Sequence, residues 1–129
     1  MSDIIMKLRV MPDFHSVTAA SPDSIKQAEE ELSLKFAAEY REYLLNFGVA
    51  SADGHEFTGI CPFPRLDVVA NTISERENNP KVPQNLYVIE KTNIDSIVIW
   101  QSDAGTVYQS APRKPPVKLC NSLCEYIGL

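Results

Sequence analysis

The sequence has few of the features that mark several common protein classes. Its 129 residues include only three cysteines, and an odd number of cysteines does not make a disulfide framework. We therefore expect reduced thiols and a cytoplasmic protein. The longest nearly uncharged apolar run, residues 96–100, is far too short to span a bilayer. The first residues include Asp3 and no long apolar stretch before a cleavage site, so we expect no signal peptide.

Basic residues are also in the minority. Twelve Lys and Arg stand against 17 Asp and Glu, which gives a net charge of −5. Because phosphate contacts require a basic surface, this balance argues against unaided binding to nucleic acid or to an anionic membrane. It permits binding to a basic protein. The acidic character lies in the first two thirds of the chain, whereas residues 111–129 carry more basic than acidic side chains.

Motifs for catalysis and cofactor binding are missing as well, including a Gly-rich phosphate loop, a nucleophile elbow and a metalloprotease helix. Cys61 with His55 and Glu56 offers a nucleophile, a base and an acid, but on an extended strand residues 55 and 61 lie about 20 Å apart. Cys120 and Cys124 are four residues apart on an expected helix, but zinc needs two further ligands. We therefore expect no catalytic residue, no cofactor and no metal.

The first two thirds of the chain predict helices. Ser21-Pro22-Asp23 is a strong helix start, after which residues 25, 28 and 32 form an apolar face while Glu29 and Glu30 point elsewhere. Residues 37–47 predict a second helix that ends at Gly48. Its expected buried stripe consists of Tyr40, Tyr43, Leu44 and Phe47.

Two further segments predict helices. Residues 4–11 fit both a helix and a strand, and we favour the helix. Residues 66–78 predict a helix with Val69, Thr72 and Ile73 inward and residues 75–77 outward.

The rest of the chain predicts strands. Residues 86–90, 96–101 and 106–109 are separated by turns that are too short for a parallel crossover, so these strands should be antiparallel. Residues 55–61 predict one more strand. The chain should end in a short helix with one apolar face, made of Leu119, Cys120, Leu123 and Ile127. We therefore predict an α+β fold, with residues 1–129 forming a single domain whose mainly antiparallel sheet is flanked by helices.

Several segments together resemble the signature of the SUKH superfamily (Smi/Knr-type proteins). Residues 25–36 resemble its acidic helix and Leu-x-Leu link, and residues 37–48 its Tyr-x-x-Tyr-Leu helix with a closing glycine. Gly59-Ile60, residues 103–108 and residues 123–127 are similar to later parts of the signature. There are two departures, because Ser33 stands where many members have Gly and Ala37 where many have Pro.

The resemblance implies a role in binding rather than catalysis. Many bacterial members resemble immunity proteins, which bind and neutralise a polymorphic or contact-dependent toxin domain, often a nuclease, in the producer's cytoplasm. An acidic inhibitor would associate faster with a basic toxin. The alternative is a non-catalytic regulatory or scaffold module, as in fungal relatives. Candidate partner contacts are acidic residues on expected turns or outer faces: Asp53, Glu56, Glu75, Glu77, Asp95 and Asp103.

Overall fold

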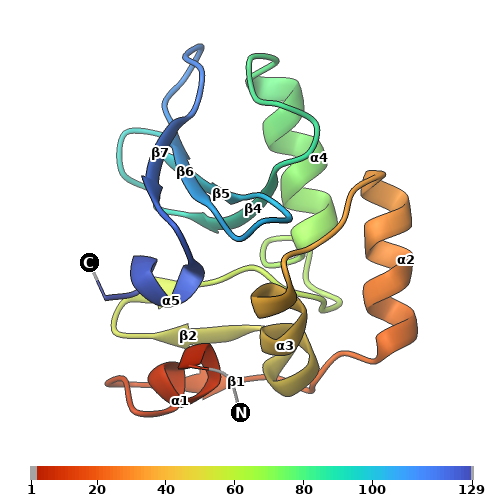
Figure 1. Cartoon of the computed structure of the whole chain (residues 1–129), viewed down its shortest axis with the longest axis vertical. Helices are drawn as coiled ribbons and strands as arrows, with labels where there is room; N and C mark the ends of the chain where they lie inside the picture. The colour runs from red at the N-terminus through yellow and green to blue at the C-terminus, as the bar shows by residue number, and fades with distance from the viewer. Residues whose placement is uncertain (1–2, 129) are drawn as a thin grey trace.

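The computed structural model describes residues 3–128 and shows an α+β fold with two antiparallel sheets (Figure 1). The helices in this range are α1 (Asp3–Arg9), α2 (Pro22–Leu32), α3 (Ala38–Phe47), α4 (Val68–Asn78) and α5 (Leu123–Tyr126). The first sheet has the order β1-β2-β3, with β1 (His15–Ser16), β2 (Ala50–Ala52) and β3 (His55–Glu56). The second has the order β4-β5-β6-β7, with β4 (Tyr87–Lys91), β5 (Val98–Gln101), β6 (Val107–Ser110) and β7 (Val117–Cys120). The predicted fold class is therefore confirmed.

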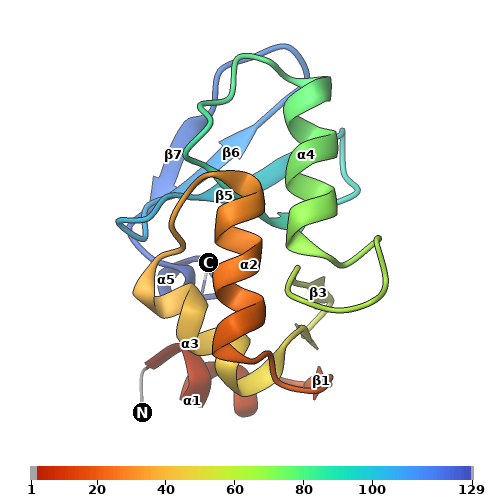
Figure 2. The ribbon, with the colours of Figure 1, turned by 90° about the vertical axis from the view of Figure 1, so that its right-hand side faces the viewer.

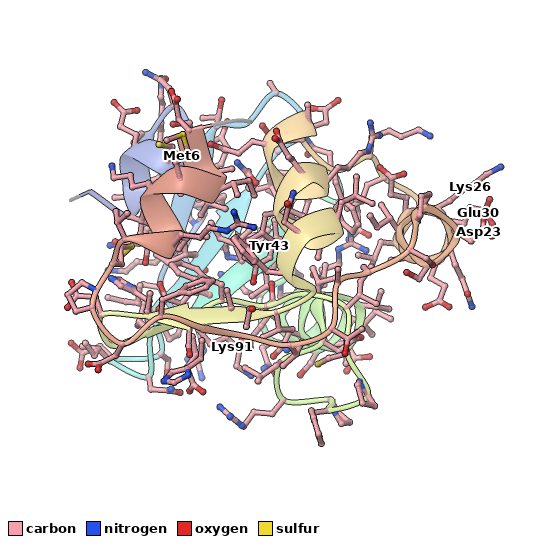
Figure 3. All side chains as sticks on the ribbon, turned by 90° about the horizontal axis from the view of Figure 1, so that it is seen from below. Met6, Asp23, Lys26, Glu30, Tyr43 and Lys91 are labelled. Atoms are coloured by element: carbon pink, nitrogen blue, oxygen red, sulfur yellow. The ribbon has the colours of Figure 1, made fainter. Side chains whose placement is uncertain are left out.

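One large hydrophobic cluster joins the helices to both sheets. Tyr43 on α3 points into the body of the molecule (Figure 3), and its hydroxyl accepts from Ala50 N–H and donates to the Thr58 carbonyl. Tyr87 on β4 likewise accepts from Ala37 N–H and donates to Gln101 Oε1. Buried phenols lower the free energy of the fold only when their hydroxyls are paired, and here each one ties α3 to a sheet.

Helix α2 begins as predicted but buries one residue that the pattern placed outside. Ser21 and Ser24 form a reciprocal capping box at its N-terminus. Asp23, Lys26 and Glu30 point into solvent (Figure 3), and α2 stands beside α3 and α4 (Figure 2). Glu29 is only 7% exposed, so the expectation that it points outward is wrong. Its carboxylate accepts hydrogen bonds from Phe36 N–H and from the Arg41 guanidinium.

Helix α4 turns a different face to the core than its apolar spacing predicts. Thr72 is buried and its hydroxyl accepts from Val88 N–H at 3.0 Å, whereas Ile73 is 46% exposed. The prediction that Ile73 points inward is therefore wrong. Glu75 is not fully outward either, because its side chain is 15% exposed. The buried face of α4 thus includes a polar contact with β4 that its apolar spacing does not predict.

The C-terminal region corrects the prediction of a helix that includes residues 119 and 120. Residues 117–120 form strand β7, which pairs with β6, and the final helix spans only Leu123–Tyr126. Leu119 and Cys120 therefore do not lie on a helix with Leu123, and Cys120 and Cys124 belong to different elements. The spacing of apolar residues fits both structures, and pairing with β6 decides for the strand.

Residues 55–61 do not form one continuous strand, as was predicted. Strand β3 ends at Glu56, and Gly59 then makes a parallel bridge with Asp67. Ile60 N–H donates to the Gly48 carbonyl at 3.1 Å. A Cβ atom on Gly59 would lie 1.7 Å from the same carbonyl oxygen, so this close approach of two backbones requires glycine.

Candidate partner-binding surface

The four-stranded sheet has two unequal faces. One face packs into the large cluster through residues such as Tyr87 and Ile99. On the other face, Val88, Trp100 and Tyr108 are cross-strand neighbours in a small second cluster. This second face is only partly covered, and a hollow opens over it.

The hollow lies between the C-terminal half of α4, the β4–β5 connection and the start of the β6–β7 connection, and has a volume of about 610 Å³. Its size is in the range of binding cavities in proteins. Figures 1 and 2 show α4 beside the four-stranded sheet. The hollow lies over one face of that sheet. Its lining residues are Glu75, Asn78, Asn79, Lys91, Asn93, Asp95, Ser96, Ile97, Val98, Trp100, Ser110, Ala111 and Pro112.

Glu75 is the most enclosed carboxylate of the hollow. Within residues 3–128, its nearest cation is Lys91 Nζ at 4.0 Å, which is too far for a hydrogen bond. No N–H or O–H of these residues donates to it. Asp95 lies on the rim and is exposed. The hollow therefore holds two carboxylates and one ammonium group above an apolar floor.

A side-chain hydrogen bond links two strands in the floor of the hollow. Trp100 is fully buried, and its indole N–H donates to Ser110 Oγ at 2.9 Å. Both residues line the hollow, together with Val98. Trp100 is the only tryptophan in the sequence. A spectroscopic signal from the tryptophan indole therefore comes from the floor of this hollow alone.

A smaller hollow of about 140 Å³ adjoins the first, and Lys91 and Asn93 line both. Its wall includes Glu56 and Arg65, whose side chains form a two-point ion pair at 2.9 and 3.1 Å. This pairing lowers the pKa of the Glu56 carboxyl below its usual value. Lys91 is labelled in Figure 3.

The β4–β5 loop forms the rim where the two hollows meet. Asn93, Asp95 and Ser96 all have left-handed backbone conformations. The Thr92 hydroxyl holds the loop from inside, because it accepts from Ile94 N–H and donates to the Ile97 carbonyl at 2.9 Å. The Ile94 side chain is 65% exposed at the tip. The loop thus presents one apolar side chain beside the acidic rim.

The structure separates the six acidic residues selected from the sequence. Glu75 and Asp95 line the large hollow, and Glu56 lines the adjoining one. The other three, Asp53, Glu77 and Asp103, are exposed and line neither. Asp103 follows the C-terminal end of β5 whereas Asp95 precedes its start, so these two lie at opposite ends of that strand.

A buried polar cluster that the sequence did not reveal lies elsewhere. Glu90 on β4 is 5% exposed and accepts hydrogen bonds from His55 Nδ1 and from the Tyr126 hydroxyl. Burial of Tyr126 and its contact with Glu90 raise the pKa of the tyrosine well above its usual value. The cluster ties β3, β4 and α5 together. The only sign of this cluster in the sequence is that Glu90 directly follows the apolar residues 86–89 of an expected strand, which is a weak signal.

Within residues 3–128, none of the three thiols is hydrogen-bonded to that cluster. Cys61 donates a weak hydrogen bond to the Phe63 carbonyl, and burial raises the pKa of its thiol. Burial likewise raises the pKa values of Cys120 and Cys124. A raised pKa leaves less of the reactive thiolate at neutral pH. Among residues 3–128, no group of three or more His, Cys, Asp or Glu side chains is placed to hold a metal ion.

The fold and this surface define a small α+β protein with a hollowed sheet face. The family model described as SMI1-KNR4 cell-wall (SUKH_5) matches residues 1–126, and the chain belongs to this family. The resemblance noted in the sequence is thereby confirmed. No curated protein matches the chain. Within the described range, no helix has both the length and the apolar character needed to cross a membrane.

Proposed function

We propose that this chain is an immunity protein, which binds and neutralises the toxin domain of a cognate polymorphic or contact-dependent bacterial toxin in the cytoplasm of the producing cell. The observation that carries this proposal is the family match over residues 1–126. The net charge of −5 supports it, because toxin domains that act on nucleic acid are commonly basic. Asp53, Glu56, Glu75, Glu77, Asp95 and Asp103 are the proposed contacts.

The first test is capture of the partner. The tagged chain is recovered from its own cells across a salt series, and the bound proteins are identified by mass spectrometry. We expect one stoichiometric partner with a basic toxin domain, whose activity is lost when the purified chain is added. Because exposed charges are screened by salt, capture should weaken as salt rises. A partner domain that stays fully active in the complex would contradict the proposal.

The second test addresses the acidic contacts on α4. Reversing Glu75 and Glu77 to lysine together should weaken binding and reduce its salt dependence. The matched control reverses Glu30 and Glu31, which are exposed on α2 and change the net charge equally. If the α4 pair leaves both affinity and salt dependence unchanged, this part of the surface does not contact the toxin.

A regulatory or scaffold role is the second candidate, and the cell-wall description of the matching family model favours it. In that case the chain should capture several cellular partners and no toxin. Recovery of a single stoichiometric toxin partner decides against it.

A further inference from the structure

The carboxylates of this chain that are mostly buried differ in one respect. Glu29, Glu39 and Glu90 each accept at least two hydrogen bonds from the protein. The Glu75 side chain is 15% exposed, against 8% for Glu29 and 7% for Glu90. Within residues 3–128 it accepts no hydrogen bond, and its ion-pair partner is Lys91 Nζ at 4.0 Å. Because neither carboxylate oxygen of Glu75 is fully buried and Lys91 lies beyond hydrogen-bond distance, both oxygens remain open to a donor. Because Glu75 lines the large hollow, a donor that enters the hollow could bind it.

The chemistry of the hollow narrows the choice of donor. Its two carboxylates, Glu75 and Asp95, outnumber its single ammonium group, Lys91, so a cation is favoured. The floor under them is apolar, with Val98 and Trp100 from β5. Guanidinium is planar, weakly hydrated and able to donate two parallel hydrogen bonds to one carboxylate, whereas an ammonium group is a strongly hydrated point charge. These properties fit arginine better than lysine.

We propose that the hollow between α4 and the β4–β5 loop is an anchor pocket for an arginine side chain of the toxin partner, with Glu75 as the paired carboxylate. The arginine methylenes lie against the partly exposed apolar lining, Ile97 and Ala111, above the buried floor, and Asp95 adds a second negative charge at the rim. The volume of about 610 Å³ leaves room for more of the partner than the arginine side chain. This inference rests on the proposed function for the identity of the partner, but not for the chemistry of the pocket.

The test uses a small probe and needs no toxin. The ¹⁵N-labelled chain is titrated with N-acetyl-arginine methylamide at constant ionic strength, and the single Trp100 indole N–H resonance is followed together with the backbone amides. We expect saturable shifts at Trp100 and along residues 93–98, with half-saturation at about 1–10 mM, as is typical of a ligand this small. The matched control ligand is N-acetyl-citrulline methylamide, which has nearly the same shape and no charge.

Two variants separate the pocket from general attraction to an acidic protein. Glu75→Gln should weaken binding of the arginine probe about tenfold, because it removes the charge that strengthens the paired hydrogen bonds. Glu30→Gln changes the net charge equally at an exposed position of α2, outside the hollow and outside the proposed toxin contacts, and should leave binding unchanged. Thermal unfolding of each variant confirms that the fold is intact.

The results that overturn the proposal are specific. Equal shifts with the arginine and citrulline probes, equal losses in the two variants, or no saturable shift at Trp100 would each refute the arginine pocket. None of these results would contradict the proposed immunity role, which the capture experiment tests separately. Conversely, a chain that binds the probe through Glu75 but captures no toxin would refute the proposed function and leave the pocket standing.

Discussion

Glu29 is a structural carboxylate at the corner between α2 and α3. It accepts from Phe36 N–H at 2.8 Å, and the Arg41 guanidinium donates to it from α3. Burial by itself raises the pKa of Glu29, but these donors outweigh it and the net pKa is lowered below the ordinary value of 4.5. The charged form therefore stabilises the fold.

The lowered pKa of Glu29 predicts a pH-dependent stability. Its contribution should be fully present above about pH 4.5, the unfolded-state pKa, and be lost as the pH falls through the lower folded-state value. Glu29→Gln should thus lower the midpoint of thermal unfolding at pH 7, and the gap to the wild type should close in acid. The exposed neighbour variant Glu30→Gln should show no such gap. A gap that persists unchanged at pH 2 would contradict this account.

Gly59 predicts a steric requirement at a single position. Gly59→Ala would place a methyl group 1.7 Å from the Gly48 carbonyl oxygen, so two backbone segments must separate. We expect a loss of more than about 3 kcal/mol in the free energy of unfolding, measured with urea. Gly54→Ala is the control: it has open space but a φ of +82°, and should cost only about 1 kcal/mol. Similar losses in both variants would mean that the close approach is unimportant.

At the scale of elements, the last helix depends on a residue from another part of the chain. Helix α5 spans only Leu123–Tyr126, and so short a helix is unstable alone. Glu39 on α3 accepts from the N–H groups of Leu123 and Cys124 at 2.6 and 3.0 Å and also from Gln101 Nε2. It thus caps α5 through tertiary structure, in addition to the helix's own N-cap Ser122, whose hydroxyl accepts from Glu125 N–H at 3.0 Å.

Removing the Glu39 carboxylate should destabilise the first turn of α5. Glu39→Ala should lower the free energy of unfolding by about 2–3 kcal/mol, because it leaves buried donors unpaired. Hydrogen exchange should accelerate most at the amides of Leu123 and Cys124. The exposed variant Glu31→Ala serves as the control and should change neither measurement. Unchanged protection of these two amides would show that α5 holds without the Glu39 carboxylate.

The elements that the sequence predicted well share a local cause. Helices α2 and α3 have a capping sequence or an apolar stripe of their own, and the β5–β6 turn ends in Gly105, whose φ is +94°. Strand β7 and Glu29 were missed because partners distant in the chain decide them: β6 pairs with residues 117–120, and Arg41 reaches back to α2. The hollow was equally invisible, since it depends on how α4 lies across the sheet. The different surroundings of Glu75, which lines the hollow, and Glu77, which is exposed outside it, could not be read from sequence.

At the scale of the whole molecule, the two hydrophobic clusters lie on opposite faces of one sheet. The larger contains residues from both sheets and from every helix, whereas the smaller, around Trp100, lies beside the hollow. Because β4 and β5 contribute to both clusters, neither can lose its packing without disturbing the other. The chain should therefore behave as one cooperative unit.

This arrangement predicts coincident unfolding transitions. Urea unfolding followed by Trp100 fluorescence reports the smaller cluster, and far-ultraviolet circular dichroism reports the helices around the larger one. We expect the two curves to superimpose, as in two-state unfolding. A fluorescence transition at lower urea would show that the hollowed face opens separately, and would divide the proposed single domain into two folding units.

The β4–β5 loop has a consequence for how partner choice can change. Asn93, Asp95 and Ser96 occupy left-handed conformations that few side chain types tolerate, so substitution there disturbs the backbone itself. Ile94 alone in this stretch lies outside that region, and the loop uses only its main-chain groups, through Thr92 and Ile97. A substitution at position 94 can therefore change the side chain exposed on the rim while the backbone of the loop keeps its conformation. A lineage, or a laboratory library, can explore new partners at that single codon while the scaffold around it stays constant.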